Sequence, residues 1–134
     1  MTGNKMTTHD LYQACQKIVM EAGEILETEK KREYKIIRKS AKELLTELDL
    51  IIQSYLSDSL TAINDCDIFY EEDKNPFNGI LLKECFIIDP IDATHNLVSG
   101  LPFYNLSIGY VKNNELMFGI IYFPYSKDIY HAYK

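Results

Sequence analysis

Apolar residues recur at three- and four-residue steps in two stretches of the first half of the chain. In the first, Thr7 or Thr8 can cap a helix that begins near His9 and runs for about 20 residues. The second runs from about Glu47 to Ala62, with Thr46 as a plausible N-cap. This spacing predicts two amphipathic helices. Their apolar positions are Leu11, Ala14, Cys15, Ile18, Ala22, Ile25 and Leu26 in the first, and Leu48, Ile51, Ile52, Tyr55, Leu56 and Leu60 in the second.

The second half of the chain has the pattern of strands and turns. "DIFYEED" (67–73) indicates a short strand ending in acids, "NPFNG" a turn, and "ECFIID" (84–89) a buried strand. A meander of two or three strands follows, with turns at Asn113-Asn114 and at 124–126. Helices first and strands last predict an α+β fold, with two N-terminal helices packed on an antiparallel sheet in a single domain, 1–134.

Composition narrows the function classes. The chain of 134 residues is 46% hydrophobic with a net charge of −6, which argues against nucleic acid as the main partner. We expect no membrane span, because no apolar segment approaches the roughly 20 residues required, and no signal peptide. Three cysteines at irregular spacing suit reduced thiols in the cytoplasm. The basic stretch 29–42 is interpreted as a solvated linker between the helices.

Carboxylates gather where two predicted strands end. Like charges this close repel, and a hard divalent cation that prefers oxygen ligands removes the repulsion. Pro90 favours an extended residue before it and a tight turn after it. That turn would return the second aspartate to the same side and expose the carbonyl of Ile91. The acidic residues are Glu71, Glu72 and Asp73 after the first strand, and Asp89 and Asp92 after the second.

The residues after the turn suit an anion. "ATHN" (93–96) can open a short helix, whose free N–H groups would accept a phosphate. Carboxylates for a metal beside an anion cradle indicate metal-assisted hydrolysis of a phosphate ester. Taken alone, Asp-Pro-Ile-Asp has a simpler interpretation as a polar turn that caps a helix, and its spacing by itself is weak evidence for a metal site.

Four blocks in order carry a family resemblance. "FIIDPIDATHNLVSGLPFYNLSIGYV" resembles the signature of the inositol monophosphatase family, and "ELLTELD" (43–49), "FYEED" and "FGIIYFPYSKDIYHA" resemble its other blocks. The similarity covers about residue 8 to 134. It implies the first half of a layered αβαβα sugar-phosphatase fold, a Mg²⁺ cofactor, and hydrolysis of a small sugar or inositol phosphate.

The resemblance also implies metal ligands. Glu71 would bind the first Mg²⁺, and Asp89 would bridge two metals. Ile91 would offer its carbonyl oxygen, and Asp92 would bind the second metal.

Water and phosphate positions follow from the same resemblance. Thr94, held by Asp49, would orient the attacking water together with Glu71. The backbone amides around Ala93 and Thr94 would hold the phosphate.

The chain departs from the family pattern at several points. Ala93 replaces a glycine, His95 stands where threonine is common, and Tyr70 replaces the glycine before the metal glutamate. Family members are about twice as long, and their C-terminal half brings a Trp-Asp metal ligand, whereas this chain has no tryptophan. One face or edge of the sheet should therefore be exposed unless a partner covers it.

Three functions stay open at this point. The first is phosphomonoester hydrolysis of an inositol or sugar phosphate. The second is a phosphatase for 3′-phosphoadenosine 5′-phosphate, a related branch. The third is a truncated, inactive remnant or binding subunit, associating as a homodimer or with a partner that supplies the missing half.

Overall fold

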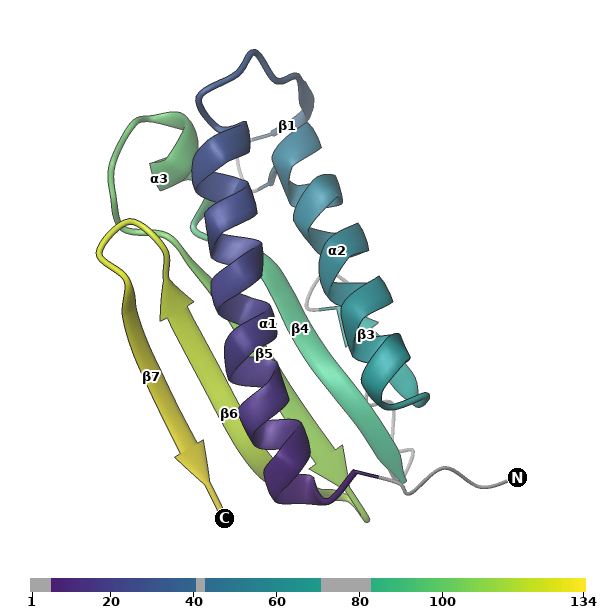
Figure 1. The fold of residues 1–134 in the computed structure, drawn as a ribbon. Helices are drawn as coiled ribbons and strands as arrows, with labels where there is room; N and C mark the ends of the chain where they lie inside the picture. The colour runs from purple at the N-terminus through teal and green to yellow at the C-terminus, as the bar shows by residue number, and fades with distance from the viewer. Residues whose placement is uncertain (1–5, 41–42, 71–82) are drawn as a thin grey trace.

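The structure is a computed structural model that describes residues 6–40, 43–70 and 83–134. The two long helices lie in the first half of the chain, and most of the strands lie in the second half (Figure 1). In chain order they are α1 (Thr8–Glu29), β1 (Ile36–Lys39), β2 (Leu44–Thr46), α2 (Glu47–Ile63), β3 (Asp67–Tyr70), β4 (Glu84–Asp92), α3 (Thr94–Val98), β5 (Asn105–Lys112), β6 (Glu115–Phe123) and β7 (Asp128–Tyr133).

Both long helices form where the apolar spacing predicts them. The side chain of Thr7 caps α1 by accepting a hydrogen bond from the backbone N–H of Asp10 at 3.0 Å, and Thr46 caps α2. The observed starts, Thr8 and Glu47, agree with the predictions to within one residue. Side-chain oxygens thus satisfy amides that have no partner inside the helix.

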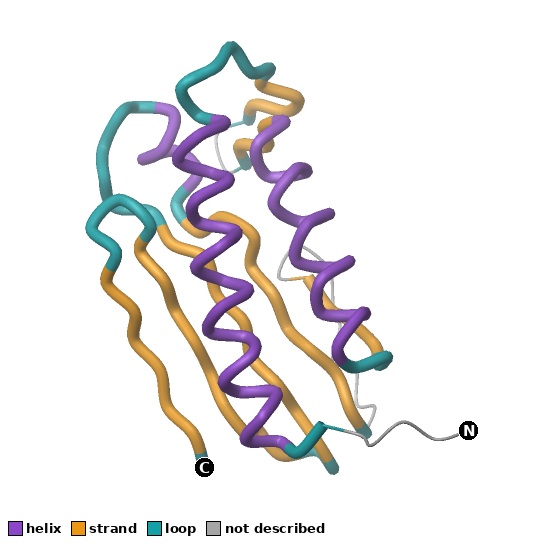
Figure 2. The backbone as a smooth tube through the Cα atoms, in the orientation of Figure 1, coloured by secondary structure: helices purple, strands orange, loops and turns teal. Residues whose placement is uncertain are grey.

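Five strands form one sheet in the order β3-β4-β5-β6-β7. Strands β4 to β7 are antiparallel neighbours, whereas β3 pairs with β4 in parallel. Helices α1 and α2 lie side by side over one face, α1 on β5 and β6 and α2 on β4 (Figures 1 and 2). The α+β fold is therefore confirmed, with one parallel pair in an otherwise antiparallel sheet.

The meander has the turns that its sequence predicts. Asn113 and Asn114 connect β5 to β6 at φ values of 53° and 61°, the left-handed pair that a two-residue hairpin turn needs. The β6–β7 connection ends at Lys127, also at positive φ. Asparagine adopts this region more readily than most residues, which explains why the pair marks the turn.

The basic stretch 29–42, interpreted from the sequence as a linker, contains a strand. Part of it forms β1, which pairs antiparallel with β2 in a separate two-stranded hairpin. Arg38 donates to Glu43 across this hairpin at 3.0 Å, and all four residues of β1 are exposed. The solvated character was predicted correctly, but the pairing was not, because charge composition says nothing about a partner strand.

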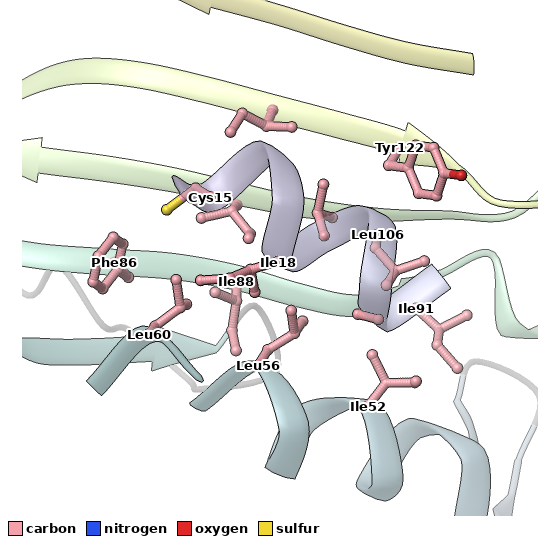
Figure 3. Close-up of a cluster of buried hydrophobic side chains, with 14 of the residues drawn as sticks. Cys15, Ile18, Ile52, Leu56, Leu60, Phe86, Ile88, Ile91, Leu106 and Tyr122 are labelled. Carbon is pink, nitrogen blue, oxygen red and sulfur yellow. The ribbon is translucent and has the colours of Figure 1, made fainter. Parts of the chain in front are cut away.

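The core lies between the helix pair and the sheet. Figure 3 shows side chains from both helices meeting those of β4 and β5. Alternate residues of each central strand enter this layer, as the strand period of two requires. The labelled members are Cys15 and Ile18 from α1, Ile52, Leu56 and Leu60 from α2, and Phe86, Ile88, Ile91, Leu106 and Tyr122.

Candidate active site

The start of α2 turns an aspartate inward. Thr46 and Asp49 form a capping box, in which Asp49 Oδ2 accepts from the backbone N–H of Thr46 at 2.9 Å and from its hydroxyl at 2.8 Å. Asp49 is only 5% exposed. Asp49 is therefore a buried acid in the first turn of α2, and its second oxygen, Oδ1, is free of the capping box and available to another element.

The end of β4 brings two aspartates to one face of the sheet. Asp89 pairs with Ser107 and Asp92 with Asn105, so three steps along β4 match two steps along β5. Residues two apart on a strand point to the same face, and this irregularity therefore restores Asp92 to the face of Asp89. The amide of Asn105 donates to Asp92 Oδ2 at 3.3 Å.

Thr94 joins the two motifs. Its hydroxyl lies 3.0 Å from Asp49 Oδ1 and 3.2 Å from the carbonyl oxygen of Ile91. Thr94 is 8% exposed, so both hydroxyl and carboxylate are held away from bulk water. The contact links residues 45 positions apart in the chain. Thr94 therefore contacts two other predicted site residues, Asp49 and Ile91.

Ala93 has a left-handed backbone, with φ 67° and ψ 48°. The Cβ atom makes this region cost roughly 1–2 kcal/mol. Its carbonyl accepts from the amides of Asn96 and Leu97, at 2.9 and 3.3 Å. The amides just before Asn96 have no acceptor within the helix, as at any helix start. Ala93 therefore carries a conformational cost that the glycine common at this position in the family would avoid.

Glu71, with Glu72 and Asp73, lies outside the described residues, so its role as a metal ligand stays a prediction. Within the ranges that the structure describes, no three His, Cys, Asp or Glu side chains are grouped to hold a metal ion. His95 is exposed and contributes its carbonyl to the end of α3. Asp89, Asp92 and Ile91 supply oxygen atoms from one bulged strand end.

Sequence reasoning gave Thr46 too small a role. It caps α2, but it also donates twice to Asp49 and thereby fixes the carboxylate that Thr94 contacts. The signal was present, since Thr-x-x-Asp is the spacing of a capping box. Asn105 was missed altogether, because its contact with Asp92 depends on strand register.

Comparison with known proteins identifies relatives of this arrangement. The model of the inositol monophosphatase family matches residues 7–134. Inositol monophosphatase 1 of Bos taurus is 34% identical over 121 residues, covering 84% of this chain and 44% of the relative. The 3′(2′),5′-bisphosphate nucleotidase CysQ of Haemophilus influenzae is 29% identical over 97 residues, covering 66% and 34%.

A solved structure extends the likeness to the fold. The IMPase of Thermotoga maritima superposes with a TM-score of 0.80 at 28% identity, over 93% of this chain and 48% of that one. The chain spans less than half the length of each of these proteins. No helix within the described ranges is long and apolar enough to cross a membrane. The family match over nearly all of its length shows that the chain belongs to the inositol monophosphatase family.

Proposed function

We propose that this chain carries the metal- and phosphate-binding part of a phosphomonoesterase site that acts on a small sugar or inositol phosphate. The hydrogen bond between Thr94 and Asp49 carries the proposal. It fixes a hydroxyl 3.2 Å from the carbonyl oxygen of Ile91, a residue that lies between Asp89 and Asp92 in the chain, at the cost of burying a carboxylate. Burial of this kind is favourable only when the carboxylate is hydrogen-bonded, and Asp49 accepts three hydrogen bonds.

Thr94 is suited to orient a water molecule. A hydroxyl has one proton to donate and two lone pairs that accept. If that proton goes to Asp49, the lone pairs of Thr94 are left to accept from water. Asp49 cannot rotate away, because Thr46 holds its other oxygen. Orientation of this sort lowers the barrier for attack on a bound phosphate ester.

The oxygen donors in this set are of the type that Mg²⁺ prefers. The register places Asp89 and Asp92 on the same face of the sheet, and Ile91 lies between them in the chain. The two carboxylates and the carbonyl of Ile91 offer the oxygen atoms that this cation prefers. Glu71 would complete the set. When bound, the ion activates water and neutralises charge on the phosphoryl group. The amides that open α3 would hold the phosphate oxygens, and Ala93 and Thr94 are the residues there.

A phosphate-release assay tests the proposal. The purified chain is incubated with inositol 1-phosphate and Mg²⁺, and inorganic phosphate is measured. We expect Mg²⁺-dependent release that falls at least a hundredfold in Asp92→Asn and in Thr94→Val. Asp65→Asn is the matched control, since Asp65 is an exposed aspartate after α2 and should keep full activity. Release that needs no divalent cation, or that survives Asp92→Asn, contradicts the proposal.

Two further candidates are distinguished by the same assay. The bisphosphate nucleotidase relative favours 3′-phosphoadenosine 5′-phosphate as a second substrate. The other candidate is the inactive remnant or binding subunit considered from the sequence. For the remnant we expect no turnover of either substrate, while Mn²⁺ used as a Mg²⁺ substitute still binds, and that binding is lost in Asp92→Asn.

Three free thiols among the described residues agree with the proposed cytoplasmic location.

A further inference from the structure

Strand β5 begins with a residue that strands do not favour. Asn105 is half-buried, and asparagine is among the residue types that are depleted in strands. Its side-chain amide donates to Asp92 Oδ2 at 3.3 Å. Within the part of the chain that the structure describes, this is the one side-chain hydrogen bond to Asp92. The amide of Asn105 is therefore spent on a carboxylate that the proposed function assigns to the metal.

Strand pairing brings these two side chains together. Pro90 has no backbone N–H, so it cannot donate to the ladder of hydrogen bonds between β4 and β5. The register shifts between Asp89 and Asp92, and Asp92 becomes the direct cross-strand partner of Asn105. Side chains directly opposite each other in an antiparallel pair share a face, with Cβ atoms about 4.5–5.5 Å apart. The short side chain of asparagine spans that gap without help from another element.

The contact restricts a carboxylate that is otherwise free to move. Asp92 is exposed at the end of β4. An exposed aspartate samples several rotamers, and a cation that binds it has to fix one of them at a cost in side-chain entropy. A donor on Oδ2 fixes the carboxylate beforehand and leaves Oδ1 for the cation. Hydrogen bonds to metal-binding carboxylates typically change metal affinity by about 10- to 100-fold.

The alternative is that Asn105 only closes the end of the sheet. The chain has a comparable contact at the other end of β4, where the side-chain amide of Asn64 donates to Glu84 Oε2 at 3.2 Å. Both contacts join an amide to a carboxylate at nearly the same distance, but Glu84 lies outside the proposed site. Asn64 therefore supplies a matched control for the general effect of losing such a bond.

We infer that Asn105 is a positioning residue that holds Asp92 for the divalent cation. The inference rests on the proposed function, because it takes Asp92 as a metal ligand. Both residues belong to strands whose pairing the structure describes, so the contact does not depend on the rest of the site. The contact is long for a hydrogen bond and partly exposed, which places the expected effect at the lower end of the range, about tenfold.

Mn²⁺ binding to the substrate-free chain tests this role, with electron paramagnetic resonance reporting the unbound ion. Asn105→Leu keeps the size of the side chain and removes the donor, and should raise the Mn²⁺ dissociation constant about tenfold. Asn105→Gln keeps the amide and should lose clearly less. Asn64→Ala should leave the dissociation constant unchanged. The urea midpoint of metal-free Asn105→Leu should equal that of the original chain, because the contact is confined to an exposed strand end.

A second measurement needs no metal. Heteronuclear NMR of the metal-free chain follows the side-chain amide resonances of Asn105. Asp92→Ala removes the acceptor and should shift these resonances. Asp65→Ala is the control, because Asp65 is an exposed aspartate after α2 and should leave them in place.

Several results would overturn the inference while the proposed function stands, as long as Mn²⁺ binds and Asp92→Asn abolishes that binding. They are an unchanged dissociation constant in Asn105→Leu, equal losses in Asn105→Leu and Asn105→Gln, an equal loss in Asn64→Ala, and unshifted resonances in Asp92→Ala. A chain that binds no Mn²⁺ at all would overturn the proposed function and this inference together. The two can therefore be told apart when they fail.

Discussion

Replacing Ala93 by glycine should stabilise the protein, although glycine is usually destabilising. Ala93 has φ 67°, where a residue with a Cβ loses about 1–2 kcal/mol. Glycine removes that strain but gains entropy in the unfolded chain, which costs about 0.4–1 kcal/mol. The net expectation for Ala93→Gly is a gain of about 0.8 kcal/mol in the free energy of unfolding, the middle of a range from about 0 to 1.6 kcal/mol. For a domain of this size that raises Tm by about 2–4 °C.

Urea unfolding followed by circular dichroism measures the difference, with Ala14→Gly as the control. Ala14 lies in the interior of α1, where the same substitution should lose about 1 kcal/mol. The two variants should therefore shift the midpoint in opposite directions. Ala93→Val should lower it, because a β-branched residue fits this region worse than alanine. Equal losses in both glycine variants would refute the argument, since they would mean that residue 93 has an ordinary backbone in solution.

Three further outcomes are expected. Thr46→Ala removes the hydroxyl that accepts from the backbone amides of Leu48 and Asp49 and that donates to the buried Asp49 carboxylate, and should cost about 1–3 kcal/mol in urea unfolding; a loss below about 0.5 kcal/mol would contradict this role. Gly23→Ala should cost about 1–3 kcal/mol by the same assay despite better helix propensity, because its Cβ would lie 2.5 Å from Tyr122 Cε2, whereas Gly119→Ala should be close to neutral. Burial raises the pKa of the Cys66 thiol from 9.0 to about 11, so Ellman's reagent should react with it far more slowly at pH 9 in the folded chain than in urea. Since the neutral thiol is the form that folding favours, its contribution to stability is complete below pH 9 and is lost as the pH rises through 11.

Local chemistry sufficed to predict much of the fold. Apolar spacing predicted the two helices, and Thr7 and Thr46 predicted where they begin, because each side chain caps its helix by a hydrogen bond to an amide no more than three residues away. The β5–β6 turn follows from Asn113 and Asn114, for the same reason. The family was recognised from four short blocks in chain order, one of them the motif at the end of β4, and the family match bears this out.

Register could not be predicted from the sequence. Whether β1 pairs with β2, or β3 runs parallel to β4, depends on which strand lies next to which, and composition does not encode a neighbour. The bulge that returns Asp92 to the face of Asp89 likewise depends on how β4 pairs with β5, because three residues of one strand match two of the other. An expected turn after Pro90 agrees with it, but only the pairing with β5 fixes the direction.

The sequence by itself determined which residues favour helix, strand and turn, and it marked Asp49 and Thr94 as candidates through the family resemblance. Tertiary structure alone decided that these two residues touch, that Thr46 holds the first in place, and that Ala93 has a left-handed backbone. The physical reason is range: caps and periodicity act over three or four residues, whereas a contact across 45 residues exists only once the core has brought its elements together.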